Sequence, residues 1–269
     1  MDFPGSQGRA ALFRRSFLQK KGVYGRDGFR FSARTLMNTK SIPLLFALSG
    51  LLATSVLANP MAPIDPSAYK APVRVACIGD SITQGVGAQG GKSYPSQLQA
   101  MLGTSWQVGN FGVSGRTLLK KGDHPYWKEG AYQKSLEFKP DVVIIMLGTN
   151  DTKGHNWRHE AEFVADYTEL VKSYQALESK PRVYVCRPCP VPGQGNFGIN
   201  EAGVKEQIKR LDVLAAEMKL GVIDMHAALA DKPQFLPDRV HPNTEGAAEM
   251  AEAAFTVLTG KTAAEPAAK

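Results

Sequence analysis

The chain has 269 residues, of which 43% are hydrophobic and 21% charged, a balance that suits one globular domain with a sizeable core. The formal net charge is +7, but nine of the 32 basic and only two of the 25 acidic residues lie in residues 1–58, which leaves 23 of each sign in the rest. Because nucleic-acid-binding domains carry an excess of positive charge, this balance excludes a basic nucleic-acid interface in the folded part.

The first element in the chain is predicted to be a secretory signal peptide at residues 37–58. Lys40 gives it a short positive start, an apolar run covers residues 42–57, and the small residue Ala58 ends it. The run is too short and too weakly apolar to favour a stable membrane span, although a retained anchor is the alternative. We therefore expect cleavage after Ala58 and a secreted or periplasmic mature chain.

Residues 1–36 do not fit the short basic region of a signal peptide, and we interpret them as a mis-assigned extension upstream of a true start at Met37. The pair Arg14-Arg15 resembles a twin-arginine export motif, but the apolar segment that such a motif requires does not follow at once. We interpret this pair as coincidental. Residues 59–72 are rich in proline and alanine and are interpreted as a linker.

Beyond this linker, apolar strand-like runs alternate with segments of helical period. Residues 141–147 form a continuous run dominated by β-branched side chains, the pattern of a strand buried on both faces of a parallel sheet. The alternation indicates one three-layer α/β domain, residues 73–259, followed by a disordered tail at residues 260–269. In chain order we predict strand 73–78, helix 94–102, strand 106–110, strand 141–147, helix 159–177, strand 182–186, helix 201–218, strand 221–224 and helix 244–258.

The three cysteines do not predict a metal or redox site. Cys77 lies in a strand-like run and is expected to be a core thiol. Cys186 and Cys189 are a lone pair, with no second cysteine pair or histidine cluster to complete a zinc site. A local disulfide between these two remains open in an oxidising compartment. We expect no metal and no cofactor.

Four short segments of chemically active residues follow predicted strands. They are residues 79–81, 112–115 and 148–151 after the first three strands, and Asp238 with His241 after the last one. In a parallel sheet with right-handed crossovers, the loops at the carboxyl ends of the strands lie at one edge. We therefore expect the four segments to converge there.

Ser81, His241 and Asp238 are the residue types of an acyl-transfer site, which needs a nucleophile, a base and a group that orients the base. Asp238 stands three residues before His241, so both can lie on one turn, with one imidazole nitrogen facing Asp238 and the other facing Ser81. Taken singly, Ser81 also fits a helix N-cap, Asp238 fits an ordinary surface acid, and His241 fits a capping residue.

Asn150 and Gly115 can supply the donors that such a site needs for a developing oxyanion. A carboxamide at the end of a buried strand can donate an N–H, and a glycine lets its backbone amide approach a substrate without a Cβ in the way. Each residue also fits ordinary turn chemistry. The shared edge and the chain order of the segments favour the catalytic interpretation.

In this order the four segments resemble the blocks of the SGNH hydrolases, also called GDSL esterases and lipases. The resemblance spans about residues 73–258, with Ile82 where the family motif has leucine. It implies a flavodoxin-like sheet of about five parallel strands, no metal, and an oxyanion hole formed by the backbone N–H groups of Ser81 and Gly115 and the side chain of Asn150. The matching stretches are Gly79-Asp80-Ser81-Ile82-Thr83, Asn110-Phe111-Gly112-Val113-Ser114-Gly115, Gly148-Thr149-Asn150-Asp151 and Asp238-Arg239-Val240-His241-Pro242.

Within that family the chain is similar to secreted bacterial sialate O-acetylesterase-like and acetylxylan-esterase-like proteins, which implies removal of small acyl groups, above all acetyl, from a sugar or polysaccharide. Further candidate substrate contacts are Asp80 beside the nucleophile, the aromatic residues Tyr126, Trp127 and Trp157, which could stack on a sugar ring, and Arg187, which could meet an acidic sugar. For the aromatic residues, packing of their loops onto the domain is the alternative.

Two rival functions remain open on the same fold. A lipase, lysophospholipase or thioesterase would use the same triad beside a long apolar groove, whereas the loops here carry Lys120, Lys121, Asp123, His124 and Lys128. An inactive glycan-binding module would be expected to have lost the nucleophile or the histidine. We expect a small acylated substrate as the partner, with no nucleic acid and no stable membrane insertion.

Overall fold

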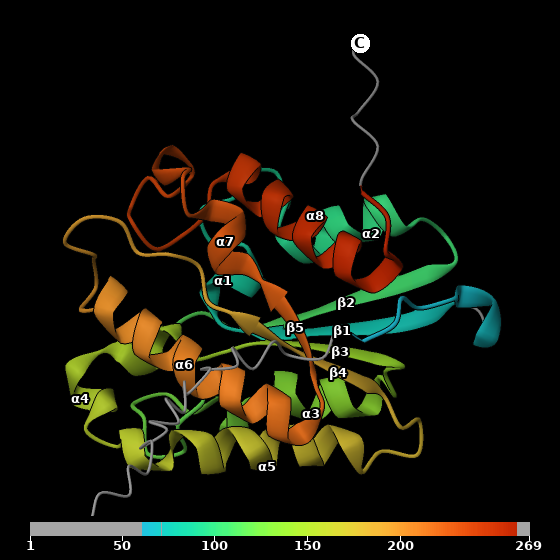
Figure 1. Cartoon of the computed structure of the whole chain (residues 1–269), viewed down its shortest axis with the longest axis horizontal. Helices are drawn as coiled ribbons and strands as arrows, with labels where there is room; N and C mark the ends of the chain where they lie inside the picture. The colour runs from blue at the N-terminus through green and yellow to red at the C-terminus, as the bar shows by residue number, and fades with distance from the viewer. Residues whose placement is uncertain (1–60, 71, 263–269) are drawn as a thin grey trace, which may run out of the picture. The chain divides into compact units, whose positions relative to one another are not determined.

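In the computed structural model a parallel sheet of five strands lies between two layers of helices (Figure 1). The structure describes residues 61–70 and 72–262. The predicted signal peptide, its cleavage after Ala58 and most of the predicted tail lie outside the described residues. Within the described part of the chain, no helix combines the length and apolar character needed to cross a membrane.

All five strands are parallel and adopt the order β2-β1-β3-β4-β5, so the predicted α/β class and its parallel sheet are confirmed. Each predicted strand is present, and its ends differ from the predicted ones by no more than two residues. The helices between the strands pass over one face of the sheet and then over the other, so both faces are covered. The strands are β1 (Val73–Gly79), β2 (Trp106–Gly112), β3 (Val142–Met146), β4 (Arg182–Arg187) and β5 (Gly221–Asp224).

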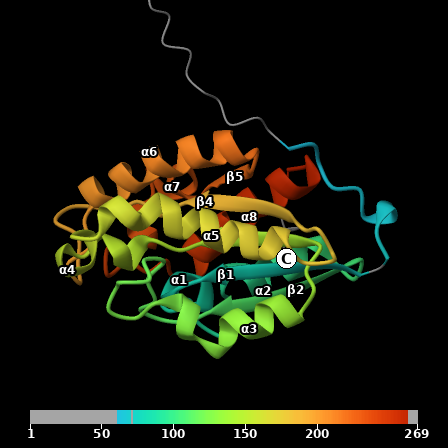
Figure 2. The ribbon, with the colours of Figure 1, turned by 90° about the horizontal axis from the view of Figure 1, so that it is seen from below.

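Helices α2, α7 and α8 cover one face of the sheet, and α3, α5 and α6 cover the other (Figure 1). Seen from below, α5 lies between α6 and α3 across this second face (Figure 2). Two short helices, α1 and α4, follow β1 and β3 at the carboxyl end of the sheet. The helices are α1 (Ser81–Gln84), α2 (Tyr94–Leu102), α3 (Gly130–Glu137), α4 (Gly154–Trp157), α5 (Phe163–Gln175), α6 (Glu201–Met218), α7 (Met225–Leu229) and α8 (Thr244–Thr259).

The structure has four helices that the sequence prediction did not include, namely α1, α3, α4 and α7, and one predicted helix begins later than expected. Helix α3 was not predicted, because its eight residues begin with glycine and bury only Tyr132 and Ser135. The helix predicted at residues 159–177 begins at Phe163, since a separate 3₁₀ turn at Glu160–Glu162 precedes it. Short 3₁₀ turns of this kind are common at helix N-termini and carry little apolar period of their own.

The strand β3 explains why the core has two halves. All five of its residues are buried, and because side chains alternate along a strand, they enter opposite faces. Ile144 packs in the core beneath α2 and α8, whereas Val143 and Ile145 pack in the core beneath α5 and α6. A central strand covered on both sides therefore needs an uninterrupted apolar run, as the sequence pattern indicated.

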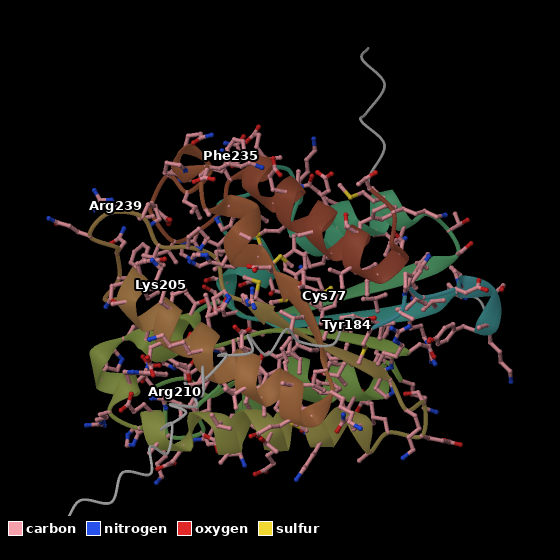
Figure 3. The ribbon with its side chains drawn as sticks, viewed as in Figure 1. Cys77, Tyr184, Lys205, Arg210, Phe235 and Arg239 are labelled. Atoms are coloured by element: carbon pink, nitrogen blue, oxygen red, sulfur yellow. The ribbon has the colours of Figure 1, made fainter. Side chains whose placement is uncertain are left out.

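The three cysteines are buried free thiols. Cys77 lies in β1 at the middle of the sheet (Figure 3), and burial raises the pKa of its thiol to about 12. The local disulfide that was open on sequence grounds is absent, because Cys186 lies within β4 while the Cys189 sulfur packs 3.7 Å from the sulfur of Met250 in α8. All three side chains therefore serve the core on the α2 and α8 side of the sheet.

Candidate functional site

Ser81 lies at the first position of α1, where β1 ends. The Asp80 side chain caps this helix by accepting the backbone N–H of Ile82 at 3.0 Å. The turn is so tight that a Cβ on Gly79 would collide with the Thr83 side chain, so only glycine fits there. The Ser81 side chain is thereby held at the carboxyl edge of the sheet, with 6% of the residue exposed.

The structure brings Ser81, His241 and Asp238 into one hydrogen-bonded chain. The Ser81 Oγ lies 2.8 Å from His241 Nε2, and His241 Nδ1 lies 2.6 Å from Asp238 Oδ2. Because a carboxylate only accepts, Nδ1 carries the ring proton, and Nε2 is left to accept from the Ser81 hydroxyl. This is the arrangement in which an imidazole can take a proton from a serine.

Asp238 is held in place by the backbone of its own turn. Its Oδ1 accepts the backbone N–H groups of Val240 at 2.9 Å and His241 at 2.7 Å. Arg239, between them, has a φ of 70°, a left-handed conformation that closes the turn; Figure 3 labels it on its exposed loop. Burial acts to raise the pKa of Asp238, but the backbone N–H and the imidazole of His241 outweigh it and hold the pKa below its usual value.

Two of the three predicted oxyanion donors, Gly115 and Asn150, line the same pocket as Ser81. Gly115 has a φ of 79°, and no atom lies within 4 Å of the place that a Cβ would occupy. The Asn150 Nδ2 donates to Asp80 Oδ2 at 3.2 Å and to the Arg116 carbonyl at 3.1 Å. These bonds use both amide hydrogens, so donation to an oxyanion requires one of them, at Arg116 or Asp80, to give way.

The pocket in front of Ser81 has a volume of about 160 Å³. It joins residues from all four predicted segments, so the expected convergence is present in space. Three further residues belong to it that sequence reasoning missed, namely Lys153, Phe197 and Ile199. It is lined by Ser81, Ser114, Gly115, Thr149, Asn150, Lys153, Phe197, Ile199, Val240 and His241.

Three predicted substrate contacts are corrected by the contacts that they make within the protein. Tyr126 is 0% exposed and donates its hydroxyl to the Phe111 carbonyl at 2.7 Å, so its ring has no free face for a sugar. Trp127 is partly buried, donates its indole N–H to the Leu118 carbonyl at 2.8 Å and packs against the core on the α5 and α6 side of the sheet. Asp80 is fully buried behind Ser81, and burial raises the pKa of its carboxyl to about 6. None of the three lines the pocket.

Trp157 and Arg187 also lie away from the pocket. The ring of Trp157 contacts Phe163 edge-on and the guanidinium of Arg210 on its face. Arg187, at the end of β4, forms ion pairs with Asp212 at 2.9 Å and with Asp224 at 2.5 Å. Its charge is therefore matched within the protein, and it is not available for an acidic sugar at this pocket.

Asp151 ties together the two loops that carry Gly115 and Asn150. It is fully buried, and its carboxylate accepts the backbone N–H groups of Leu118 at 2.9 Å and Leu119 at 2.7 Å. Burial, helped by the neighbouring Asp80 carboxylate, outweighs these donors and raises its pKa from 3.8 to about 7.

This raised pKa predicts how stability depends on pH. The folded protein binds the Asp151 proton more tightly than the unfolded chain does, so its contribution is complete below pH 3.8 and is lost as pH rises through about 7. We expect Asp151→Asn to make the fall in unfolding free energy across this window shallower, by up to about 1.4 kcal/mol per pH unit. Urea unfolding at pH 4, 5, 6 and 7 measures it; equal slopes for the two proteins would contradict the assignment.

A second hollow, of about 320 Å³, lies beside α7 and the loop after β4. Its polar centre is the pair of His226 and Glu201, 2.8 Å apart. None of its lining residues, all within the described ranges, is a serine, threonine or cysteine, so it offers no hydroxyl or thiol nucleophile. Among residues 61–70 and 72–262, no group of three or more histidine, cysteine or acidic residues is placed to hold a metal ion.

Comparison with known proteins identifies relatives for this site and fold. A sequence model of the GDSL-like lipase/acylhydrolase family matches residues 77–249. An acetylxylan esterase from Xylanibacter ruminicola is 38% identical over 208 residues, which cover 70% of this chain and 43% of that protein. The chain thus spans less than half the length of this relative.

Two solved structures share the fold at low sequence identity. A carbohydrate acetylesterase from Sinorhizobium meliloti and an aryl esterase from M. smegmatis each superpose with a TM-score of 0.54 and 23% identity. Each likeness covers 68% of this chain and 96% of the other. At that identity the likeness extends to the architecture, and the function has to be argued from the pocket.

Proposed function

Because the chain belongs to the GDSL-like lipase/acylhydrolase family, we propose that it is a serine esterase that removes short acyl groups, acetyl above all, from carbohydrate. The observation that carries this proposal is the hydrogen-bonded chain from Ser81 through His241 to Asp238 at the mouth of the pocket. These two hydrogen bonds, of 2.8 and 2.6 Å, support the proposed roles of Ser81 as nucleophile, His241 as base and Asp238 as orienting carboxylate.

In the proposed reaction, Ser81 Oγ attacks the ester carbonyl carbon while His241 Nε2 takes the hydroxyl proton. The carbonyl oxygen becomes an oxyanion, which accepts hydrogen bonds from the backbone N–H groups of Ser81 and Gly115 and from Asn150. When the intermediate collapses, His241 returns the proton to the leaving alcohol, and an acyl-enzyme remains on Ser81. Water then attacks this ester with His241 as base again, which releases the acid and restores the serine.

The choice of an acetylated sugar or polysaccharide as substrate has two supports. The relative from Xylanibacter ruminicola is named for action on acetylxylan. The pocket is small, about 160 Å³, and its polar residues Ser114 and Thr149 stand beside the apolar Phe197, Ile199 and Val240. A lipase or thioesterase would need a longer apolar groove for its acyl chain. An inactive glycan-binding module would not require a serine, a histidine and a carboxylate in hydrogen-bonding positions.

We expect hydrolysis to be fastest for acetyl esters and to decline steadily toward decanoyl esters. Each methylene buried in an apolar groove contributes about 0.8 kcal/mol, but a pocket of about 160 Å³ has room for only a short acyl chain. Values of kcat/KM on 4-nitrophenyl esters of two to ten carbons measure this, with the Ser81→Ala protein as the blank. Values that rise with chain length would transfer the assignment to a lipase.

The proposal places this activity outside the cytoplasm, secreted or in the periplasm. Residues 37–58 have the layout of a signal peptide, and we propose that the exported chain begins after Ala58. No resident metal or cofactor is part of the proposed chemistry, because the serine, imidazole and carboxylate supply every proton transfer.

A further inference from the structure

Phe197 is a large apolar residue whose side chain is exposed to solvent. It is 55% exposed and lines the pocket in front of Ser81. Its φ is 54°, in the left-handed region that a bulky L-residue rarely adopts. Residues held in this region persist where the surrounding structure fixes them, and they occur preferentially at functional sites. An exposed aromatic side chain on a left-handed residue beside the pocket is therefore a candidate contact for a bound substrate.

The turn that carries Phe197 is tied down on both sides. Asn196 and Ile199 exchange backbone hydrogen bonds of 3.2 and 2.8 Å, with Phe197 and Gly198 at the tip. The Asn196 side chain accepts the backbone N–H of Phe197 at 2.8 Å and donates to the Asp238 carbonyl at 3.0 Å. The turn is thus anchored directly to the loop that holds the triad carboxylate.

This anchoring places the Phe197 ring beside the imidazole of His241. Their ring centroids are 5.7 Å apart, at an interplanar angle of 58°. In the proposed reaction His241 returns its proton to the oxygen of the leaving alcohol, so that alcohol has to lie against the imidazole. The acyl group lies toward Gly115 and Asn150, where its oxygen is bound. Phe197 therefore stands on the alcohol side of the scissile bond.

We propose that Phe197 is the platform on which the sugar ring of the leaving alcohol stacks. This inference rests on the proposed function and adds the subsite that recognises the carbohydrate. A pyranose presents C–H groups on its faces, and an aromatic face is suited to bind them. Phe197 thus takes the candidate role that the sequence offered for Tyr126, Trp127 and Trp157, whose rings pack against the core and do not line the pocket.

The test compares two acetate esters with different alcohols, a mono-O-acetylated methyl xyloside and ethyl acetate, followed in a pH-stat. In Phe197→Asn we expect the ratio of kcat/KM for the sugar ester to that for ethyl acetate to fall about tenfold, mostly through KM for the sugar ester. Asparagine tolerates the left-handed conformation, so the fold should persist, which thermal unfolding checks. Phe197→Trp should keep the wild-type ratio.

Val213→Ala is the matched control, because Val213 is an apolar residue of α6 with 57% exposure that does not line the pocket. It should leave the ratio at its wild-type value. An unchanged ratio in Phe197→Asn overturns the platform, and so does an equal loss on both esters, which would make Phe197 a support for His241. A wild-type protein that hydrolyses neither ester overturns the proposed function itself, and the platform with it.

Discussion

Ser81→Ala is expected to lower kcat on an acetyl ester by about 10⁶-fold, the scale on which serine hydrolases lose turnover without their nucleophile. The Ser81 hydroxyl has His241 Nε2 as its partner at 2.8 Å, and an alanine methyl group can neither attack nor pass on a proton. Residual hydrolysis would come from the oxyanion donors and from substrate binding. Initial rates on 4-nitrophenyl acetate measure the loss.

The fold should survive this change, because the Ser81 hydroxyl has the His241 side chain as its hydrogen-bond partner and not a backbone group. The N-terminus of α1 is capped by Asp80 instead. A matched control is Ser173→Ala, which makes the same change on α5, where the hydroxyl bonds the Leu170 carbonyl. That control should keep wild-type turnover. A Ser81→Ala protein that retained more than a tenth of wild-type kcat would remove Ser81 from the nucleophile's role.

Asp238→Asn is expected to lower kcat by about 10⁴-fold. An asparagine that keeps its oxygen toward the backbone N–H groups of Val240 and His241 turns its NH₂ toward His241 Nδ1. Nδ1 then has to accept, the ring proton moves to Nε2, and the nitrogen facing Ser81 can no longer take a proton. In the opposite orientation the asparagine NH₂ would face the backbone N–H groups of Val240 and His241, which are donors too. Neither orientation therefore restores the base.

The matched control for this change is Asp212→Asn, an equally conservative substitution at an acid that pairs with Arg187 away from the pocket. Its turnover should stay near that of the wild type. The double variant Ser81→Ala with Asp238→Asn should be no slower than Ser81→Ala alone, because residues that act as one unit are not additive. A loss of less than tenfold in Asp238→Asn would mean that His241 does not depend on this carboxylate.

The parts of the fold that the sequence predicted share a strong local signal. β3 is an uninterrupted apolar run, and α6 and α8 begin at asparagine caps with helical periods behind them. The four segments of the site could be placed at one edge because parallel strands direct their carboxyl ends to the same side. Their resemblance to one family, in order, is confirmed by the family match over residues 77–249.

The parts that the sequence missed depend on contacts between distant segments. Whether a loop aromatic is buried is decided by what packs over it: Tyr126 bonds the Phe111 carbonyl, and Trp157 meets Arg210 of α6. Phe197 gave one local signal, since asparagine and glycine flank it in a stretch without helical or strand period. That pattern predicts a turn. The position of Phe197 beside His241 could not be predicted, because it depends on the hydrogen bond that joins Asn196 to the distant Asp238.

The central claim is that Ser81 is a nucleophile activated by His241, and covalent labelling tests it most directly. A fluorophosphonate reacts with an activated serine by losing fluoride and forming a stable phosphonyl ester on the hydroxyl oxygen. We predict one adduct per chain, located by peptide mass spectrometry on Ser81, with labelling much slower in Asp238→Asn and absent after denaturation. An actively hydrolysing protein that stayed unlabelled, or that carried the adduct on another residue, would contradict the account.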